Sequence, residues 1–257
     1  MRWTYHGGLA MSNMILWKLR RMIKTKPFYF MLAVMLATGL IYIPILIHDD
    51  TENAFELMCK TQSQLASLLD LFAGLYAALC ITHDMQNRFV SSAVMAGNSR
   101  KTIVFTEILG FAVTIFISVL VPSVISYFAG VIFLGAGDAF AGGTTGVGTA
   151  LLTSVLYAFV CASAFSIVIP FCFVIKTEGF SCIINLIVLI LCWCGAQGLA
   201  ELGIETVLPY LTFGQLFILC GGELTAFDVL LALGVSVVNF AALFTISYII
   251  LKRTELK

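Results

Sequence analysis

Residues 28–47 read FYFMLAVMLATGLIYIPILI, a stretch of twenty positions without one charged side chain. A helix needs about 20 consecutive apolar residues to cross the hydrocarbon core of a bilayer, so we expect a membrane span here. Further apolar runs that meet or approach this length cover residues 108–134, 150–175, 180–198 and 227–251. The sequence therefore predicts an all-α integral membrane protein, with residues 1–257 forming a single transmembrane domain.

Two shorter apolar runs need separate treatment. Residues 65–81 form a run shorter than 20 residues that includes Asp70, but the segments that flank it favour a sixth span. Residues 210–220 are too short to cross, and we expect them to form an interfacial or re-entrant segment packed on the outer side. The prediction is six spans.

Composition excludes a soluble protein. Hydrophobic residues make up 60% of the chain and charged residues only 11%, against about 25% charged residues in soluble domains. The basic residues are not clustered as a nucleic-acid-binding surface would require. The first long apolar run begins only at Phe28 and is too long for a signal peptide, so we expect the whole chain to be mature protein.

The loops between the predicted spans differ sharply in basic residues. With six spans, thirteen of the 14 Lys and Arg residues fall on one side, and Lys60 alone falls on the other. Basic loops mark the cytoplasmic side, so both termini are expected there, in a multi-pass protein of the cell membrane. Residues 48–64, 135–148 and 199–226 are then expected outside.

The segment before the first span, residues 11–26, predicts an amphipathic helix. Apolar side chains share one arc of it: Ile15, Leu16, Leu19, Met22 and Ile23. Basic side chains share the opposite arc: Lys18, Arg20, Arg21 and Lys24. Such a helix lies in the headgroup plane with its basic face toward anionic lipid. A topology signal without this role is the alternative.

The loop of residues 83–101 is longer than the 2–8 residues that commonly join two helices. Gly97–Asn98 near its end is a turn signal. We expect a short helix followed by a turn, which suits docking of a soluble partner. A solvated loop is the alternative.

Small residues recur at every fourth position of the fourth span and predict a tight helix–helix contact, within or between subunits. They are Ala150, Ser154, Ala158, Ala162 and Ser166.

No catalytic or metal-binding constellation is recognisable in the sequence, because the histidines are solitary and the acids dispersed. The glycine-rich residues 135–148 contain no lysine, which a phosphate-binding loop would need. Cys59 and Cys220 lie in predicted external segments, and whether they pair is left open.

Asp70 is the one charged residue well inside a predicted span. Ionisable groups at such positions face protein or water rather than lipid. Ser63 and Ser67 are its nearest polar neighbours and are expected on about the same helical face. Asp70 either holds the bundle together or borders the outer end of a substrate pathway.

The whole pattern resembles the membrane subunits of ABC transporters of the type-two exporter class. Those permeases have an amphipathic connector helix before the first span, similar to residues 17–26 here. Their second–third loop forms a coupling helix with a small-residue turn and a Ser–Arg pair, similar to Gly97–Asn98–Ser99–Arg100. Short outer helices resemble residues 199–226, and a basic tail resembles Lys252–Arg253. Glu107 departs from the pattern, because many relatives carry lysine there.

The resemblance implies a permease subunit of an ATP-driven exporter for a hydrophobic or amphipathic substrate, such as an antimicrobial peptide, drug or lipid. The chain would bind no cofactor and catalyse nothing itself. Two separate ATPase subunits would hold ATP and Mg, and a second permease copy or a related chain would complete the pathway. The expected ATPase-coupling residues are Arg88, Phe89, Gly97, Asn98, Ser99 and Arg100. The rivals are a secondary carrier and an accessory scaffold subunit, both working without an ATPase.

Overall fold

The computed structural model describes residues 11–48, 51, 53–87, 89–95, 97–134, 146–175, 177–203, 206–221 and 225–253. All regular structure within these residues is helical, and six helical segments are long and apolar enough to cross a membrane. The prediction of a six-span helical protein is confirmed. The long helices are α2 (Lys26–His48), α3 (Ala54–Ala77), α6 (Arg100–Leu134), α7 (Gly146–Phe165), α9 (Glu178–Glu201) and α11 (Ala226–Arg253).

Short elements extend or connect these helices. A π-helical turn (Ala78–Thr82) joins α3 to α4 (His83–Gln86), and a 3₁₀ turn (Ser166–Val168) joins α7 to α8 (Ile169–Val174). The remaining elements are α1 (Met11–Ile23), α5 (Phe89–Met95), a 3₁₀ turn (Leu208–Tyr210) and α10 (Thr212–Cys220).

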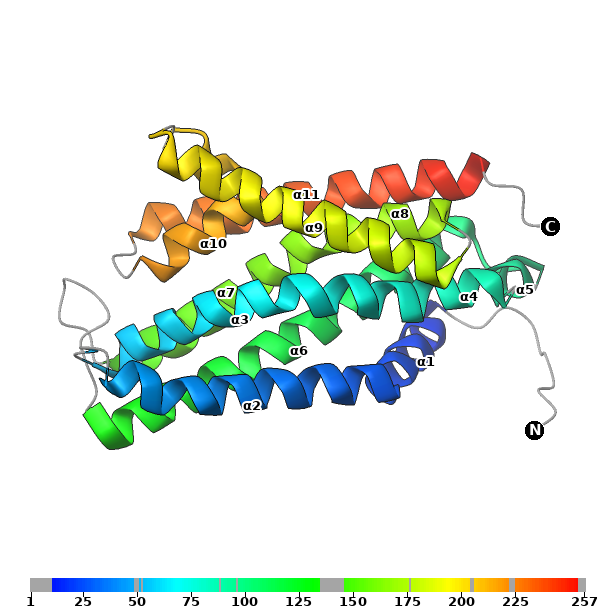
Figure 1. Ribbon diagram of the computed structural model, residues 1–257. Helices are drawn as coiled ribbons and strands as arrows, with labels where there is room; N and C mark the ends of the chain where they lie inside the picture. Colours follow the sequence, from blue (N-terminus) through cyan, green and yellow to red (C-terminus); the bar gives the residue numbers. More distant parts are fainter. Residues whose placement is uncertain are drawn as a thin grey trace.

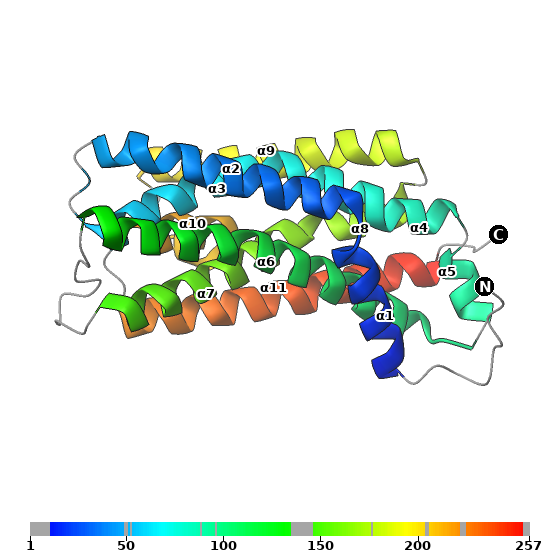
Figure 2. The same ribbon diagram turned by 90° about the horizontal axis from the view of Figure 1, so that it is seen from below.

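The six long helices run side by side, and α2 begins at the same end of the bundle at which α11 finishes (Figure 1). We call this end the basic end, because it carries Lys18, Arg21, Arg100, Lys101 and Lys252. Helix α1 lies across the basic end rather than along the bundle, and α5 lies beyond the ends of the long helices (Figure 2). Helix α10 lies in the opposite half.

The second span begins earlier than the sequence indicated. The helix that carries the predicted span of residues 65–81 already starts at Ala54, within the segment 48–64 that was expected outside. The Asn53 side chain accepts a hydrogen bond from the Glu56 N–H at 2.9 Å and caps the helix. Apolar residues of the first turns are buried although Glu56 and Lys60 interrupt them.

The central helices of the bundle are mostly buried, and the peripheral helices expose apolar side chains. Within their most apolar stretches, 67% of the residues in the α3 segment and 78% in the α7 segment are buried, against 17% in α11. The five small residues of α7 and its following turn are all buried, and the Ser154 hydroxyl donates to Met58 Sδ on α3 at 3.0 Å. The small-residue stripe therefore makes a contact within this chain.

Helix α10 packs inside the bundle. Phe213 contacts Phe165 of α7 with ring centroids 5.6 Å apart, and Phe217 contacts Trp193 of α9 at 4.8 Å. A Cβ at Gly214 would lie 2.1 Å from the Leu208 carbonyl oxygen, so only glycine allows the preceding turn to fold back on α10. Cys220 at its end and Cys59 on α3 both carry free thiols.

Candidate functional site

The most polar buried site in the described residues lies where α1 meets the bundle. Lys18 is only 2% exposed, and its ammonium binds Asp84 of α4 and Glu107 of α6, the latter at 2.6 Å. Arg21, one turn along α1, binds the other oxygen of Asp84 at 2.5 Å. We call Lys18, Arg21, Asp84 and Glu107 the ion cluster. It fastens α1 to two different spans.

Charges within the ion cluster are balanced, with two cations facing two carboxylates. Burial alone would lower the pKa of Lys18, but Glu107 and Asp84 outweigh that effect and the pKa is raised. Lys18 therefore stays charged at neutral pH, and the stability that its charge contributes is lost as pH rises through this raised pKa.

Aromatic contacts extend the same junction to α5. The rings of Trp17 and Phe89 are stacked with centroids 5.0 Å apart, and the Arg21 guanidinium lies 5.4 and 5.3 Å from the two centroids. This arrangement permits cation–π attraction to both rings. Helix α1 also approaches α6 closely, because a Cβ at Gly110 would lie 2.6 Å from Met22 Sδ. The junction thus joins α1, α4, α5 and α6.

One residue of the predicted basic arc of α1 is buried against the bundle. The prediction that Lys18 faces anionic lipid is wrong, because Lys18 lies with Met14 and Met22 on the buried face. Leu16, from the predicted apolar arc, is 52% exposed, and Arg20 and Lys24 are exposed beside it. Two carboxylates supplied by distant segments make it favourable to bury the lysine.

Four of the predicted coupling residues, Gly97 to Arg100, lie at the turn between α5 and α6; Phe89 begins α5, and Arg88 lies outside the described residues. Gly97 has φ +88°, which a residue with a side chain rarely adopts, and its N–H donates to the Val94 carbonyl. The Asn98 N–H and side-chain amide both donate to the Ala93 carbonyl at 3.1 Å. Gly97 and Asn98 thus terminate α5.

Ser99 caps the start of α6, and Arg100 binds the end of α11. The Ser99 hydroxyl accepts a hydrogen bond from the Thr102 N–H at 3.1 Å, which caps α6. Arg100 donates from Nη1 to the carbonyl oxygens of Leu251 at 3.0 Å and Lys252 at 2.8 Å. These carbonyls are among the last four of α11, which lack partners inside the helix. Arg100 therefore ties the start of α6 to the end of α11.

Met95, the last residue of α5, is a large apolar side chain that is 80% exposed. A large apolar side chain at a helix end beyond the bundle contributes little to folding. It is available for contact with another molecule.

Asp70 lies in the middle of the bundle and is 5% exposed. Its Oδ1 has no hydrogen-bond partner among the described residues. Ser67, three residues before Asp70 on the continuous helix α3, is exposed and donates to the Ser63 carbonyl, whereas Asp70 itself is buried.

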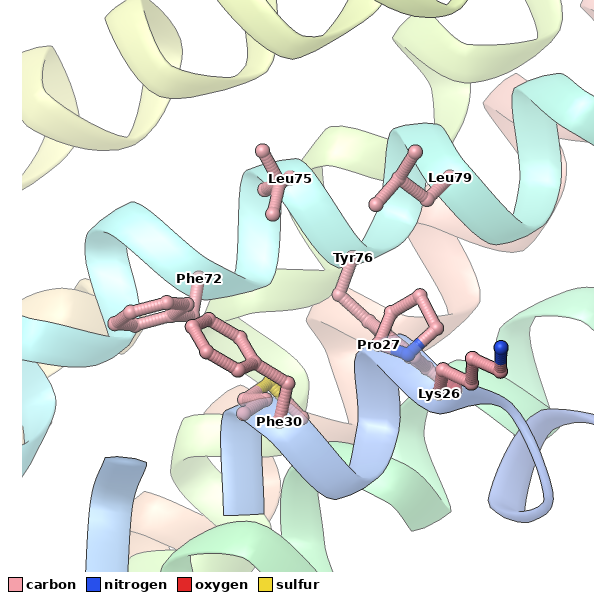
Figure 3. Close-up of a pocket in the computed structure, with 8 residues that line it drawn as sticks. Lys26, Pro27, Phe30, Phe72, Leu75, Tyr76 and Leu79 are labelled. Atoms are coloured by element: carbon pink, nitrogen blue, oxygen red, sulfur yellow. The ribbon is translucent and has the colours of Figure 1, made fainter. Parts of the chain in front are cut away.

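An apolar groove of about 260 Å³ separates the start of α2 from α3. Figure 3 shows Lys26 and Pro27 at one end of the groove, with Phe30 and Phe72 at the other. The two phenyl rings make an edge contact with centroids 6.0 Å apart. The groove is small and has one charged residue in its lining, Lys26.

Sequence reasoning missed the ion cluster. Asp84 and Glu107 were visible as acids among mostly apolar neighbours, but nothing in the sequence relates them to Lys18, which lies 66 positions before Asp84. A lysine on an amphipathic helix next to a span is ordinarily solvated, so the pairing required the three-dimensional structure.

The six apolar helices are compatible with a membrane transport protein. No protein-family model matches the chain, and no curated protein matches its sequence.

Proposed function

We propose that this chain is the transmembrane permease subunit of an ATP-driven ABC exporter. It would move a hydrophobic or amphipathic substrate, such as a peptide, drug or lipid, out of the cell, with energy from two separate ATPase subunits that bind ATP and Mg. The observation that carries the proposal is the junction at the basic end, where the ion cluster and the Trp17–Phe89 stack fasten α1 to α5 and to two spans.

In this proposal the basic end is cytoplasmic, as are both termini, because basic residues are concentrated there. Helix α1 lies in the headgroup plane as a connector helix, with Leu16 toward lipid and Arg20 and Lys24 toward headgroups. Helix α10 is a re-entrant segment on the outer side, since its polar backbone is covered by protein.

The junction is suited to passing on a movement that begins at α5. A displacement of α5 would be transmitted to α1 through the Trp17–Phe89 stack and Arg21. The Asp84–Lys18–Glu107 contacts carry it to the second and third spans, and Arg100 carries it to α11. Contiguous chains of packed side chains and hydrogen bonds of this kind can couple distant elements. Closure of ATPase subunits below α5 would thus rearrange several spans together.

A second permease copy or a related chain would complete the pathway. The exposed apolar side chains of α2 and α9 and the groove of Figure 3 offer surfaces for that chain or for substrate entering from lipid. Asp70 would border the outer part of the pathway and attract cationic amphiphiles.

The decisive experiment concerns Met95. Changing Met95→Glu places a charge on the exposed end of α5 without altering a buried contact. We expect the ATPase activity that co-purifies with the tagged chain from its native membrane to fall about tenfold, as for loss of an interface hot spot. Leu202→Glu, at a residue 75% exposed on the opposite half, is the matched control and should leave that activity unchanged. Equal activity in both variants would contradict docking at α5.

One observation favours the rival function of a secondary carrier, namely the buried Asp70 carboxyl with an unpartnered oxygen. Transport in vesicles distinguishes the two functions. An exporter requires ATP and its ATPase subunits, whereas a carrier works with an ion gradient alone. Uptake by the isolated chain, driven by a proton or sodium gradient, would replace the exporter proposal with the carrier.

A further inference from the structure

We propose that a groove between α6, α7 and α11 binds an anionic phospholipid, with an acyl chain in the groove and the phosphate at Lys101 and Lys252. The groove has a volume of about 540 Å³, within the range of about 300–1,000 Å³ for small-molecule sites. The three helices contact one another and lie side by side (Figure 2). This proposal does not depend on the exporter proposal.

The lining of the groove is wholly apolar and rich in aromatic rings. Most of its side chains are half-buried, so the groove opens on the side of the bundle. Its residues are Phe105, Ile108, Leu109, Ala112, Val113, Phe116, Phe159, Ala162, Phe240, Ala241 and Phe244. Such a lining offers an acyl chain contact without any polar group to be desolvated.

The length of the groove matches one leaflet. Phe105 and Phe116 are separated by eleven helical steps along α6, which is about 16.5 Å at 1.5 Å per residue. Half of the hydrocarbon core is about 15 Å. The groove lies in the half of the bundle next to the basic end, so one acyl chain entering from that end would fill it.

Cationic groups stand at the basic end of the groove. Lys101 is one turn before Phe105 on α6, and Tyr248 and Lys252 follow Phe244 at successive turns of α11. The Lys101 ammonium lies 5.6 Å from the Tyr248 ring centroid. Because Arg100 binds the carbonyls of Leu251 and Lys252, it holds the two helix ends together and keeps Lys101 and Lys252 as neighbours.

The charge at this end selects the occupant. Within the described part of the chain, no carboxylate lies within ion-pair distance of Lys101 or Lys252, and both are exposed. Basic residues near the membrane surface attract anionic headgroups. A second copy in the same membrane orientation would bring like charges to the same depth, which opposes an interface there.

Photocrosslinking of the full chain in lipid nanodiscs tests the proposal. The probes are phosphatidylglycerol and phosphatidylcholine carrying the same diazirine acyl chain, and peptide mapping locates the label. We expect phosphatidylglycerol to label α6 and α11 around the groove and phosphatidylcholine to label them weakly. Ala241→Trp fills the groove and should reduce labelling to the phosphatidylcholine level, whereas Ala242→Trp, exposed but outside the lining, should leave it unchanged.

The charge is tested separately, in exposed residues whose substitution leaves the core intact. The double variant Lys101→Gln/Lys252→Gln should lower phosphatidylglycerol labelling about tenfold, while Lys24→Gln on α1 should not. Equal labelling by both probes, labelling unaffected by Ala241→Trp, or chain-to-chain crosslinks through the groove residues would each overturn the proposal. If Ala241→Trp fails to fold, the double lysine variant decides.

Discussion

The ion cluster at the basic end and the surroundings of Asp70 differ in whether the buried ionisable side chains have partners. Lys18, Asp84 and Glu107 come from three elements, and each finds a partner of opposite charge. Asp70 is buried almost as deeply, yet one of its oxygens has no hydrogen-bond partner among the described residues. A matched buried charge fixes the position of the elements that supply it. An unmatched one weakens the fold and is retained for another reason.

Breaking the ion cluster should give the largest effect. Lys18→Met leaves Asp84 and Glu107 buried beside each other without a cation, except for Arg21 at Asp84. Removing one partner of a buried charge network costs about 3–5 kcal/mol of unfolding free energy. Thermal unfolding in detergent, followed by intrinsic fluorescence, measures the loss.

The control for that prediction is Lys24→Met on the exposed face of α1, which should change stability by no more than about 0.5 kcal/mol. Adding Glu107→Gln to Lys18→Met should recover part of the loss, because one unpaired carboxylate is removed. A Lys18→Met protein as stable as the Lys24→Met protein would show that the cluster does not hold α1.

A smaller effect is expected from the close packing beside the ion cluster. Gly110→Val places a branched side chain where Met22 lies, since even a Cβ would be 2.6 Å from Met22 Sδ. Overpacking of this kind costs about 1–3 kcal/mol. Gly234→Val, on α11 where an added Cβ meets nothing within 4 Å, should be close to neutral in the same unfolding measurement. If the two variants lost similar amounts of stability, close packing at Gly110 would not explain how α1 docks on α6.

Asp70→Asn should have the smallest effect on stability and so sharpens the comparison. The amide keeps the size of the side chain and removes a buried charge that has an unpartnered oxygen, so we expect no loss of stability or a gain of up to about 1 kcal/mol. Transport, measured in vesicles with a cationic amphiphile, should fall. Asp84→Asn is the matched change in the ion cluster and should destabilise. A loss of stability in Asp70→Asn as large as in Asp84→Asn would make Asp70 a packing residue.

The long apolar runs predicted the six spans because burial in lipid requires an uninterrupted apolar helix. The start of α3 was missed because Glu56, Lys60 and Gln62 make residues 53–64 look like a loop. In the structure Glu56 and Lys60 pair with each other at 3.0 Å, and Leu57 and Met58 beneath them are buried.

The turn at Gly97–Asn98 was recognised from its residue types, because glycine and asparagine signal a left-handed or capped turn locally. The partner of Arg100 could not be predicted from the sequence, because the carbonyls that it binds lie about 150 residues away along the chain. Sequence patterns identify features that depend on neighbours along the chain. They do not identify pairs formed only by tertiary structure.

The contact of Arg100 with α11 has a consequence for how this protein changes in evolution. Both of its acceptors are backbone carbonyl oxygens, which every residue type possesses. This contact therefore places no requirement on the side chains at positions 251 and 252, whereas it constrains position 100 to a long side chain with a forked donor. Substitutions at one end of this contact call for no compensation at the other. The fastening between the third and sixth spans would be invisible to any search for covarying pairs, even in a deep set of homologous sequences.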